Sequence, residues 1–320
     1  MEQTDLYQLF NTTWTIHRLS PLHHSKDCET LLNNQVALKT YATRLRDHLT
    51  GDVLSGVQAD TGADENALSK TGALKDCLWQ PISPSREASV SQNALSGILV
   101  TLEYENIVYK AALLTDSSND RKGSTALPLL LTRFPTVLRQ TFLAFLSANF
   151  DTYISSLRLP SNFLCAGLQA YIGSLQSAKI VDAIRELHLT LSFSSSIAPD
   201  LRSLNVNISR TALGDLLRAK ASNRGQSLEQ KLRSPLIDNL TAYLEEHLAM
   251  KLELDGSDDS KHHVRLSKVV CAPFVLGGEG RVKLVVADKD DDETQSALEA
   301  GMKLLGLVVN RAVVGDRSTT

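Results

Sequence analysis

The chain has 320 residues, of which 42% are hydrophobic and 22% charged, and its formal net charge at pH 7 is -3. This composition is close to that of average globular proteins, so it excludes a wholly disordered chain and a polybasic, histone-like protein. Any contact with nucleic acid must therefore come from a local basic patch.

The cysteines and the hydropathy exclude further classes of protein. Cys28, Cys77, Cys165 and Cys271 lie far apart and form no CxxC pair, which argues against a zinc knuckle and a disulfide scaffold. The first ten residues lack the basic segment of a secretory signal, and the longest uncharged run, residues 159–178, is too polar to span a membrane. We therefore expect a protein of a reducing compartment with no membrane contact.

The N-terminal third combines a strand, a helix and a polar stretch. Trp14 and Ile16 indicate a first strand, and apolar residues at helical spacing over residues 38–49 predict a helix. Residues 59–96 are rich in Ser, Gly, Asp, Asn, Pro and Ala and show almost no apolar periodicity. That composition predicts a flexible surface insertion.

The middle of the chain predicts a hairpin followed by two helices. Residues 98–104 and 107–113 flank a short Glu-Asn turn and are typical of the two strands of a β-hairpin. Helices are expected from Pro135 to Phe150 and again after Pro160, because each proline is followed by apolar residues at helical spacing.

Strands and helices also alternate further along. Residues 187–193 and 204–208 alternate apolar and polar side chains and predict two strands. Ser209 is placed to cap a short helix, Ser227 opens a capping box with Gln230, and a further helical face continues through residues 236–244.

The C-terminal region predicts a second hairpin and a final helix. Residues 264–274 and 281–286 flank the glycine-rich run 277–280, which precedes a strand and therefore indicates a hairpin turn and not a phosphate loop. A helix should begin at the acids 291–293 and present an apolar stripe. The hairpins and half-buried strands favour antiparallel sheets, so the predicted fold class is α+β.

Motifs of enzymes and metal sites are almost absent. The chain has no P-loop, no GxGxxG after a strand, no GxSxG elbow, no HExxH and no kinase signature. We therefore predict a protein without catalytic residues, cofactor or metal, although a Ser/His/Asp triad stays open because triads are not local in sequence. The pairs His23-His24 and His262-His263 lack close ligand partners and are predicted to be solvated.

One segment departs from the acidic balance of the chain. Residues 202–233 carry seven basic residues against only Asp215 and Glu229. The residues predicted to face DNA phosphates are Arg210, Arg218, Lys220, Arg224, Lys231 and Arg233. The alternative is an ordinary solvated face of two short helices, because no aromatic residues interleave to stack on bases.

An ordered series of motifs resembles the centromere protein L (CENP-L) family, in particular its fungal members. The series begins with Thr13-Trp14-Thr15-Ile16-His17-Arg18-Leu19-Ser20-Pro21-Leu22, in which a Trp-Thr strand runs into Ser-Pro-Leu. The later matches, in order, are Leu127–Leu131, Phe150–Ile154, Leu187–Phe193, Leu204–Ile208 and Ser227–Leu244. The resemblance spans roughly residues 11–312.

The resemblance implies a fold and an organisation. It implies curved, mainly antiparallel sheets flanked by helices, in a single domain over residues 8–315. Two lobes, about 8–123 and 124–315, are the alternative. Residues 316–320 are expected to form a disordered tail.

The resemblance also implies a function, that of a non-enzymatic adaptor of the inner kinetochore, in the nucleus at the centromere. It implies pairing with a CENP-N-like subunit in the constitutive centromere-associated network, contact with other inner-kinetochore subunits, and support of CENP-A nucleosome binding, kinetochore assembly and chromosome segregation. Family members also self-associate through a sheet edge, so a homodimer is expected when the chain is alone. The rival hypothesis is an independent nucleic-acid-binding clamp that uses residues 202–233.

The C-terminal hairpin is the predicted partner interface. Its apolar side chains occur at both odd and even positions, which suggests that both faces of the hairpin are covered. One cover is the final helix. The other is either another part of this chain, such as the helix at 134–150, or a partner, namely CENP-N or a second copy of the chain, and the resemblance favours a partner. The residues predicted for this interface are Val264, Leu266, Val282, Leu284 and Val286.

Overall fold

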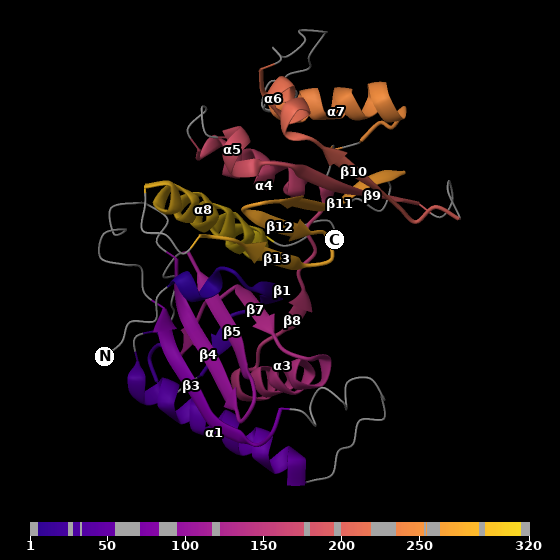
Figure 1. The fold of residues 1–320 in the computed structure, drawn as a ribbon. Coiled ribbons are helices and arrows are strands. Elements are labelled where there is room, and N and C mark those ends of the chain that lie inside the picture. The colour runs from indigo at the N-terminus through magenta and orange to yellow at the C-terminus, as the bar shows by residue number, and fades with distance from the viewer. Residues whose placement is uncertain are drawn as a thin grey trace. The chain divides into compact units, whose positions relative to one another are not determined.

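The computed structural model describes residues 6–24, 28–32, 34–54, 71–82, 95–116, 122–175, 180–194, 200–218, 235–252, 254, 263–287 and 292–314. The chain divides into two compact units. Unit 1 comprises Met1–Leu157 and Val308–Gly315, and unit 2 comprises Arg158–Leu307 and Asp316–Thr320. Each unit has mainly antiparallel strands flanked by helices, which confirms the predicted α+β class (Figure 1).

Unit 1 is built on strands in the order β1-β7-β5-β4-β3, with β8 paired to β1 and a separate pair formed by β2 and β6. The strands are β1 (Thr13–Leu19), β2 (Leu22–His23), β3 (Leu74–Ile82), β4 (Ser96–Tyr104), β5 (Val108–Thr115), β6 (Ser124–Thr125), β7 (Leu129–Arg133) and β8 (Ile154–Ser156). The helices are η1 (Leu6–Leu9), α1 (Gln35–Leu54) and α3 (Thr136–Phe150).

One face of the unit 1 sheet packs on α1 and α3. The register places Trp79, Val100 and Ala111 side by side on this face, and all three are buried. They belong to one apolar cluster with Tyr41 of α1 and Phe150 of α3, whose ring centroids lie 4.5 Å apart. Each large side chain buried in this way stabilises the fold by roughly 1.5–3 kcal/mol.

The opposite face of the unit 1 sheet is buried as well. Leu99, Ala112 and Leu131 follow one another in register across β4, β5 and β7, and none is more than 1% exposed. β7 therefore carries buried side chains on both faces, which explains why its sequence is a continuous apolar run and not an alternating one.

Unit 2 is built on strands in the order β10-β9-β11-β12-β13. The strands are β9 (Leu187–Phe193), β10 (Ser203–Ile208), β11 (Val264–Cys271), β12 (Phe274–Gly277) and β13 (Arg281–Leu284). The helices are α4 (Ser161–Gly173), α5 (Ile180–Ile184), α6 (Arg210–Arg218) and α7 (Pro235–Leu248). α8 (Asp292–Val314) begins in unit 2, and its residues from Val308 onward belong to unit 1.

Helix α4 covers one face of the unit 2 sheet, which we call the inner face. Four buried apolar side chains lie on it in register across the strands, namely Leu189, Val269, Leu276 and Val282. Gly167 of α4 approaches so closely that an added Cβ would lie 2.9 Å from Leu276. The ring centroids of Tyr171 and Phe274 are 5.0 Å apart.

Most of the predicted elements are confirmed. The helices expected at residues 38–49, 135–150 and after Pro160 are α1, α3 and α4, and both prolines occupy the N-cap position. The strands 187–193 and 204–208 are β9 and β10. The Ser209 hydroxyl accepts the Ala212 N–H at 3.4 Å and so caps α6 as expected.

Two predictions are wrong in part. Residues 264–274 are not one strand, because the chain folds back between β11 and β12 at Pro273, which has no N–H to continue a ladder. Residues 59–96 are not all insertion, because Leu74–Ile82 forms β3. Residues 59–70 and 83–94, the Ser227 capping box and the tail 316–320 lie outside the described residues.

Two glycines should respond oppositely to a methyl group. At Gly97 in β4, an added Cβ would collide with the backbone carbonyl oxygen of Leu113, whereas at Gly51 in α1 nothing lies within 4 Å. We expect Gly97→Ala to lower the free energy of unfolding by about 1–3 kcal/mol. Gly51→Ala should raise it by about 0.5–1 kcal/mol. Urea unfolding measures both, and equal effects would contradict the packing of β4 against β5.

A second prediction concerns His17 of β1, which is 5% exposed. Burial, and to a lesser extent the charge of Arg139, lowers the pKa of His17 from 6.5 to about 4. Between pH 6.5 and pH 4, His17 is therefore mostly protonated in the unfolded chain and mostly neutral in the folded chain. The free energy of unfolding should consequently fall as the pH is lowered toward 4. Between pH 7.5 and pH 5 this residue should account for a loss of about 2 kcal/mol.

The matched variant for this test is His17→Gln, which cannot titrate. Urea unfolding of both proteins at the two pH values gives the comparison. The loss of stability on acidification should be smaller in the variant, and an equal loss in both proteins would show that His17 is not the responsible group.

Candidate interaction surfaces

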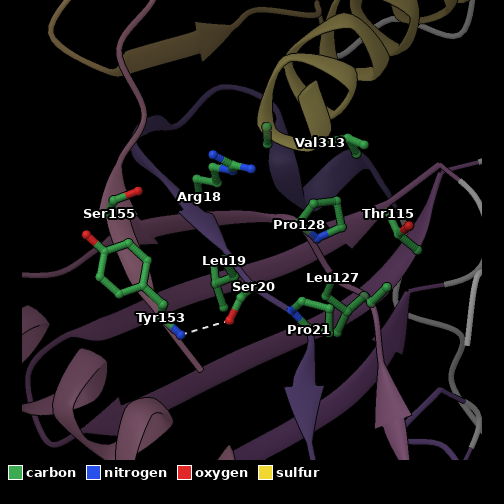
Figure 2. Close-up of a pocket in the computed structure, with 12 residues that line it drawn as sticks. Arg18, Leu19, Ser20, Pro21, Thr115, Leu127, Pro128, Tyr153, Ser155 and Val313 are labelled. Atoms are coloured by element: carbon green, nitrogen blue, oxygen red, sulfur yellow. Dashed lines mark hydrogen bonds between the residues drawn. The ribbon is translucent and has the colours of Figure 1, made fainter. Parts of the chain in front are cut away.

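A shallow hollow of about 390 Å³ opens on unit 1 (Figure 2). Arg18 and Leu19 of β1 line it together with Tyr153 beside β8 and Val313 near the end of α8. Tyr153 is 75% exposed and Val313 is 53% exposed. Large apolar groups therefore stand at its rim in contact with solvent.

Backbone and hydroxyl hydrogen bonds hold the floor of the hollow. The Tyr153 N–H donates to the Ser20 hydroxyl at 2.8 Å, as Figure 2 shows, and the Ser20 N–H donates to the Tyr153 carbonyl at 3.0 Å. The Thr152 hydroxyl donates to the Ser20 carbonyl at 2.8 Å. These bonds position the start of the Ser20-Pro21-Leu22 motif.

The lining of the hollow combines apolar side chains with one cation and a few hydroxyl groups. Arg18 is the one charged side chain among the lining residues, and no histidine, cysteine or carboxylate accompanies the hydroxyls of Ser20, Thr115 and Ser155. A serine without a base cannot be activated as a nucleophile. The hollow can therefore accept an apolar group beside an anionic one, but it offers no acid–base pair.

The predicted partner interface lies mostly inside the chain. Leu266, Val282, Leu284 and Val286 are between 2% and 6% exposed, and only Val264 among the five is half-buried. The helix considered as an alternative cover, α3, has its buried residues in the unit 1 cluster.

A β-bulge explains why apolar residues of β11 occur at both odd and even positions. The register against β9 shifts between Leu266 and Lys268, so that Ser267 is the extra residue. Leu266 and Val269, three positions apart, therefore both lie on the inner face opposite Leu191 and Leu189. The change of parity reflects this bulge, which sequence periodicity does not reveal, and does not by itself indicate a second covered face.

The outer face of the unit 2 sheet is basic. It carries four cations, Arg265, Lys268, Arg281 and Lys283, and strands β9 to β13 contain no aspartate or glutamate. Lys268 and Arg281 are exposed and lie on either side of Gly277 in the register. Within the described part of the chain, none of the four cations forms an ion pair. Sequence reasoning missed this surface because its charges are divided between β11 and β13, which are separated in the sheet by the uncharged β12.

The basic segment predicted to face DNA is only partly described. Arg210 pairs with Asp182, and Arg218 lies 3.7 Å from Asp215, so both charges have acidic neighbours. Lys220, Arg224, Lys231 and Arg233 lie outside the described residues. The assignment of these residues to DNA stays a prediction.

Two edge strands, β3 of unit 1 and β10 of unit 2, differ in how they are protected against pairing with another strand. β3 contains Lys75, Asp76 and Pro81 and a register shift, which are the features that blunt an edge against pairing. β10 contains no charge and no proline, and it pairs only with β9 among the described strands. Its apolar residues Leu204 and Val206 are half-buried. β10 is therefore the edge better suited to accept another strand.

The histidine pairs do not behave alike. His23 and His263 are exposed as predicted, and His262 lies outside the described residues, but His24 is only 2% exposed. The expectation of a solvated side chain is therefore wrong for His24. Its ring contacts Cys28 and Thr125, so polar partners compensate for its burial.

Other features of the described residues bear on chemistry. Gly277–Gly280 joins β12 to β13, which confirms the predicted hairpin turn. No group of three or more His, Cys, Asp or Glu side chains in the described regions could hold a metal ion. None of the helices searched there is long and apolar enough to cross a membrane.

Comparison with known proteins identifies the family of the chain. No curated protein matches the chain. A family model described as Centromere protein L matches residues 8–313, nearly the whole length. The chain therefore belongs to the centromere protein L (CENP-L) family, a family of structural kinetochore proteins.

Proposed function

We propose that this chain is a non-enzymatic adaptor of the inner kinetochore that pairs with a CENP-N-like subunit through the β10 edge of unit 2. The pair would support CENP-A nucleosome binding, kinetochore assembly and chromosome segregation in the nucleus. The observation that carries the proposal is that β10, at the edge of its sheet, pairs only with β9 among the described strands. When the partner is absent, the same edge would pair two copies of this chain.

Strand addition is the favoured mode because an edge strand exposes a row of backbone donors and acceptors that a partner strand satisfies at once. The half-buried Leu204 and Val206 add apolar contact next to that ladder, and Leu201, 45% exposed, extends it toward the N-terminal end of β10. Four of the five hairpin residues predicted for the interface are buried, so their contribution would be to hold the sheet that presents β10.

The test is Leu204→Asp combined with Val206→Asp, in a chain co-expressed with the CENP-N-like subunit. Two carboxylates at this edge should reduce recovery of the partner by about tenfold or more, since a loss of only about 1.4 kcal/mol changes the affinity tenfold. Both positions are half-buried, so the fold should survive, which circular dichroism checks.

The matched control is Leu78→Asp. Leu78 is 39% exposed and belongs to β3, the protected edge strand, so it receives the same chemical change in a comparable setting. Partner recovery should be normal for this variant. A partner lost from Leu78→Asp and retained by the β10 variant would place the interface elsewhere.

A second candidate function, direct contact with DNA, is favoured by the outer face of the unit 2 sheet. Its unpaired cations would lie against phosphates, and an open sheet face without acids presents little repulsion to a polyanion. This surface would serve within the partnered complex. The segment from Arg210 to Arg233 would add to it only if its described arginines exchanged their acidic neighbours for phosphates.

The test of DNA contact is Lys268→Glu combined with Arg281→Glu in the partnered complex. DNA affinity at low salt should fall, and the slope of log affinity against log salt should decrease by about two, at about 0.9 per phosphate contact. Lys110→Glu with Arg133→Glu is the control, since these two cations also lie close together across strands of a sheet but belong to unit 1. Equal losses in both double variants would indicate a general charge effect and no specific surface.

A further inference from the structure

A thiol and a buried imidazole meet beside the β2–β6 pair of unit 1. The Cys28 Sγ lies 3.3 Å from the His24 Nδ1. His24 is 2% exposed, whereas Cys28 is half-buried, unlike the other three cysteines, which are buried. Neither residue lines the hollow or lies on the surfaces described above.

The hydrogen bonds of His24 define which ring nitrogen carries hydrogen. Nδ1 lies 3.0 Å from the Cys28 carbonyl oxygen, which can only accept, so Nδ1 must be the donor. The same nitrogen lies 3.3 Å from Sγ, so its hydrogen stands beside the sulfur as well as the carbonyl oxygen. Donors beside a sulfur stabilise the thiolate over the thiol.

Thr125 fixes the ring in this orientation. Its hydroxyl lies 2.9 Å from the His24 Nε2 and accepts the Leu31 N–H at 3.0 Å. Thr125 is fully buried, so these bonds are shielded from water. The imidazole is therefore held on both sides, and its Nδ1–H cannot turn away from Cys28.

The other cysteines are in a different setting. Burial, and next the charge of Asp76, raises the pKa of Cys77 to about 12, and burial raises the pKa of Cys271 to about 12. Cys165 is 4% exposed. These three thiols are inaccessible, and the first two also resist ionisation, so they serve as internal controls.

We propose that Cys28 is a modification site that small hydroperoxides oxidise to a sulfenic acid, with His24 as the residue that positions and stabilises its thiolate. The thiol first loses its proton to water. The thiolate sulfur then attacks one oxygen of the hydroperoxide, so that an S–O bond forms and the O–O bond breaks. The departing hydroxide takes up the proton that the thiol released and becomes water; sulfur is oxidised by two electrons and hydrogen peroxide is reduced.

The experiment treats the full-length folded chain with hydrogen peroxide and traps sulfenic acid with dimedone, followed by peptide mass spectrometry of all four cysteines. Cys28 should be trapped at least about tenfold faster than Cys77, Cys165 or Cys271. Its rate in the folded chain should also exceed its rate in urea, where the imidazole is no longer nearby. A slower rate in the folded chain overturns the proposal without any variant.

Three variants test the role of the imidazole. His24→Leu removes the N–H donor and should slow trapping at Cys28 about tenfold, since an unassisted thiol is only a few per cent thiolate at neutral pH. His24→Asn returns an amide N–H near the position of Nδ1 and should restore much of the rate. His23→Leu, at the exposed neighbouring position, should leave it unchanged. Equal rates in folded His24→Leu and the wild-type chain would overturn the proposal.

Discussion

One extra residue in β11 determines which side chains of unit 2 face its core and which face outward. Residues two apart in a strand share a face, so without the bulge at Ser267 the side chain of Lys268 would follow Leu266 onto the covered face. The bulge is held in place, because the Ser267 carbonyl accepts the Gly278 N–H at 2.8 Å and its hydroxyl donates to the Thr190 carbonyl at 2.9 Å. Burying an unpaired lysine would be far more costly than accommodating one extra residue.

The two units use their sheets in contrasting ways. In unit 1 both faces are buried, as the runs through Trp79 and through Leu131 demonstrate, so little of that sheet is left for another molecule. In unit 2 one face packs on α4, and the other carries Lys268 and Arg281 in contact with solvent. An adaptor needs a rigid part and an open part, and this division supports the placement of the proposed contacts on unit 2.

Two buried histidines illustrate how burial can be compensated in different ways. His17 lies within the unit 1 core, where desolvation keeps it neutral and its Nε2 is 3.4 Å from the Thr132 hydroxyl. His24 lies at the edge of the same unit and engages both ring nitrogens with polar partners. The first is a source of acid sensitivity, whereas the second holds a fixed donor beside a half-buried thiol. Neither role could be read from the residue type alone.

The α+β class, the family resemblance and most helices and strands could be predicted from the sequence. Local periodicity and capping residues encode them, as at β9 and at Ser209 before α6. The sequence did not reveal β3, whose buried Cys77 and Trp79 lie within a mostly polar stretch of sequence, or the reversal at Pro273. The basic outer face, the bulge and the His24–Cys28 contact were decided by tertiary structure alone. The first two depend on strand pairing between residues far apart in the chain, and a register cannot be deduced from the periodicity of either strand taken separately. The third depends on Thr125, which is 101 positions from His24 and orients its ring.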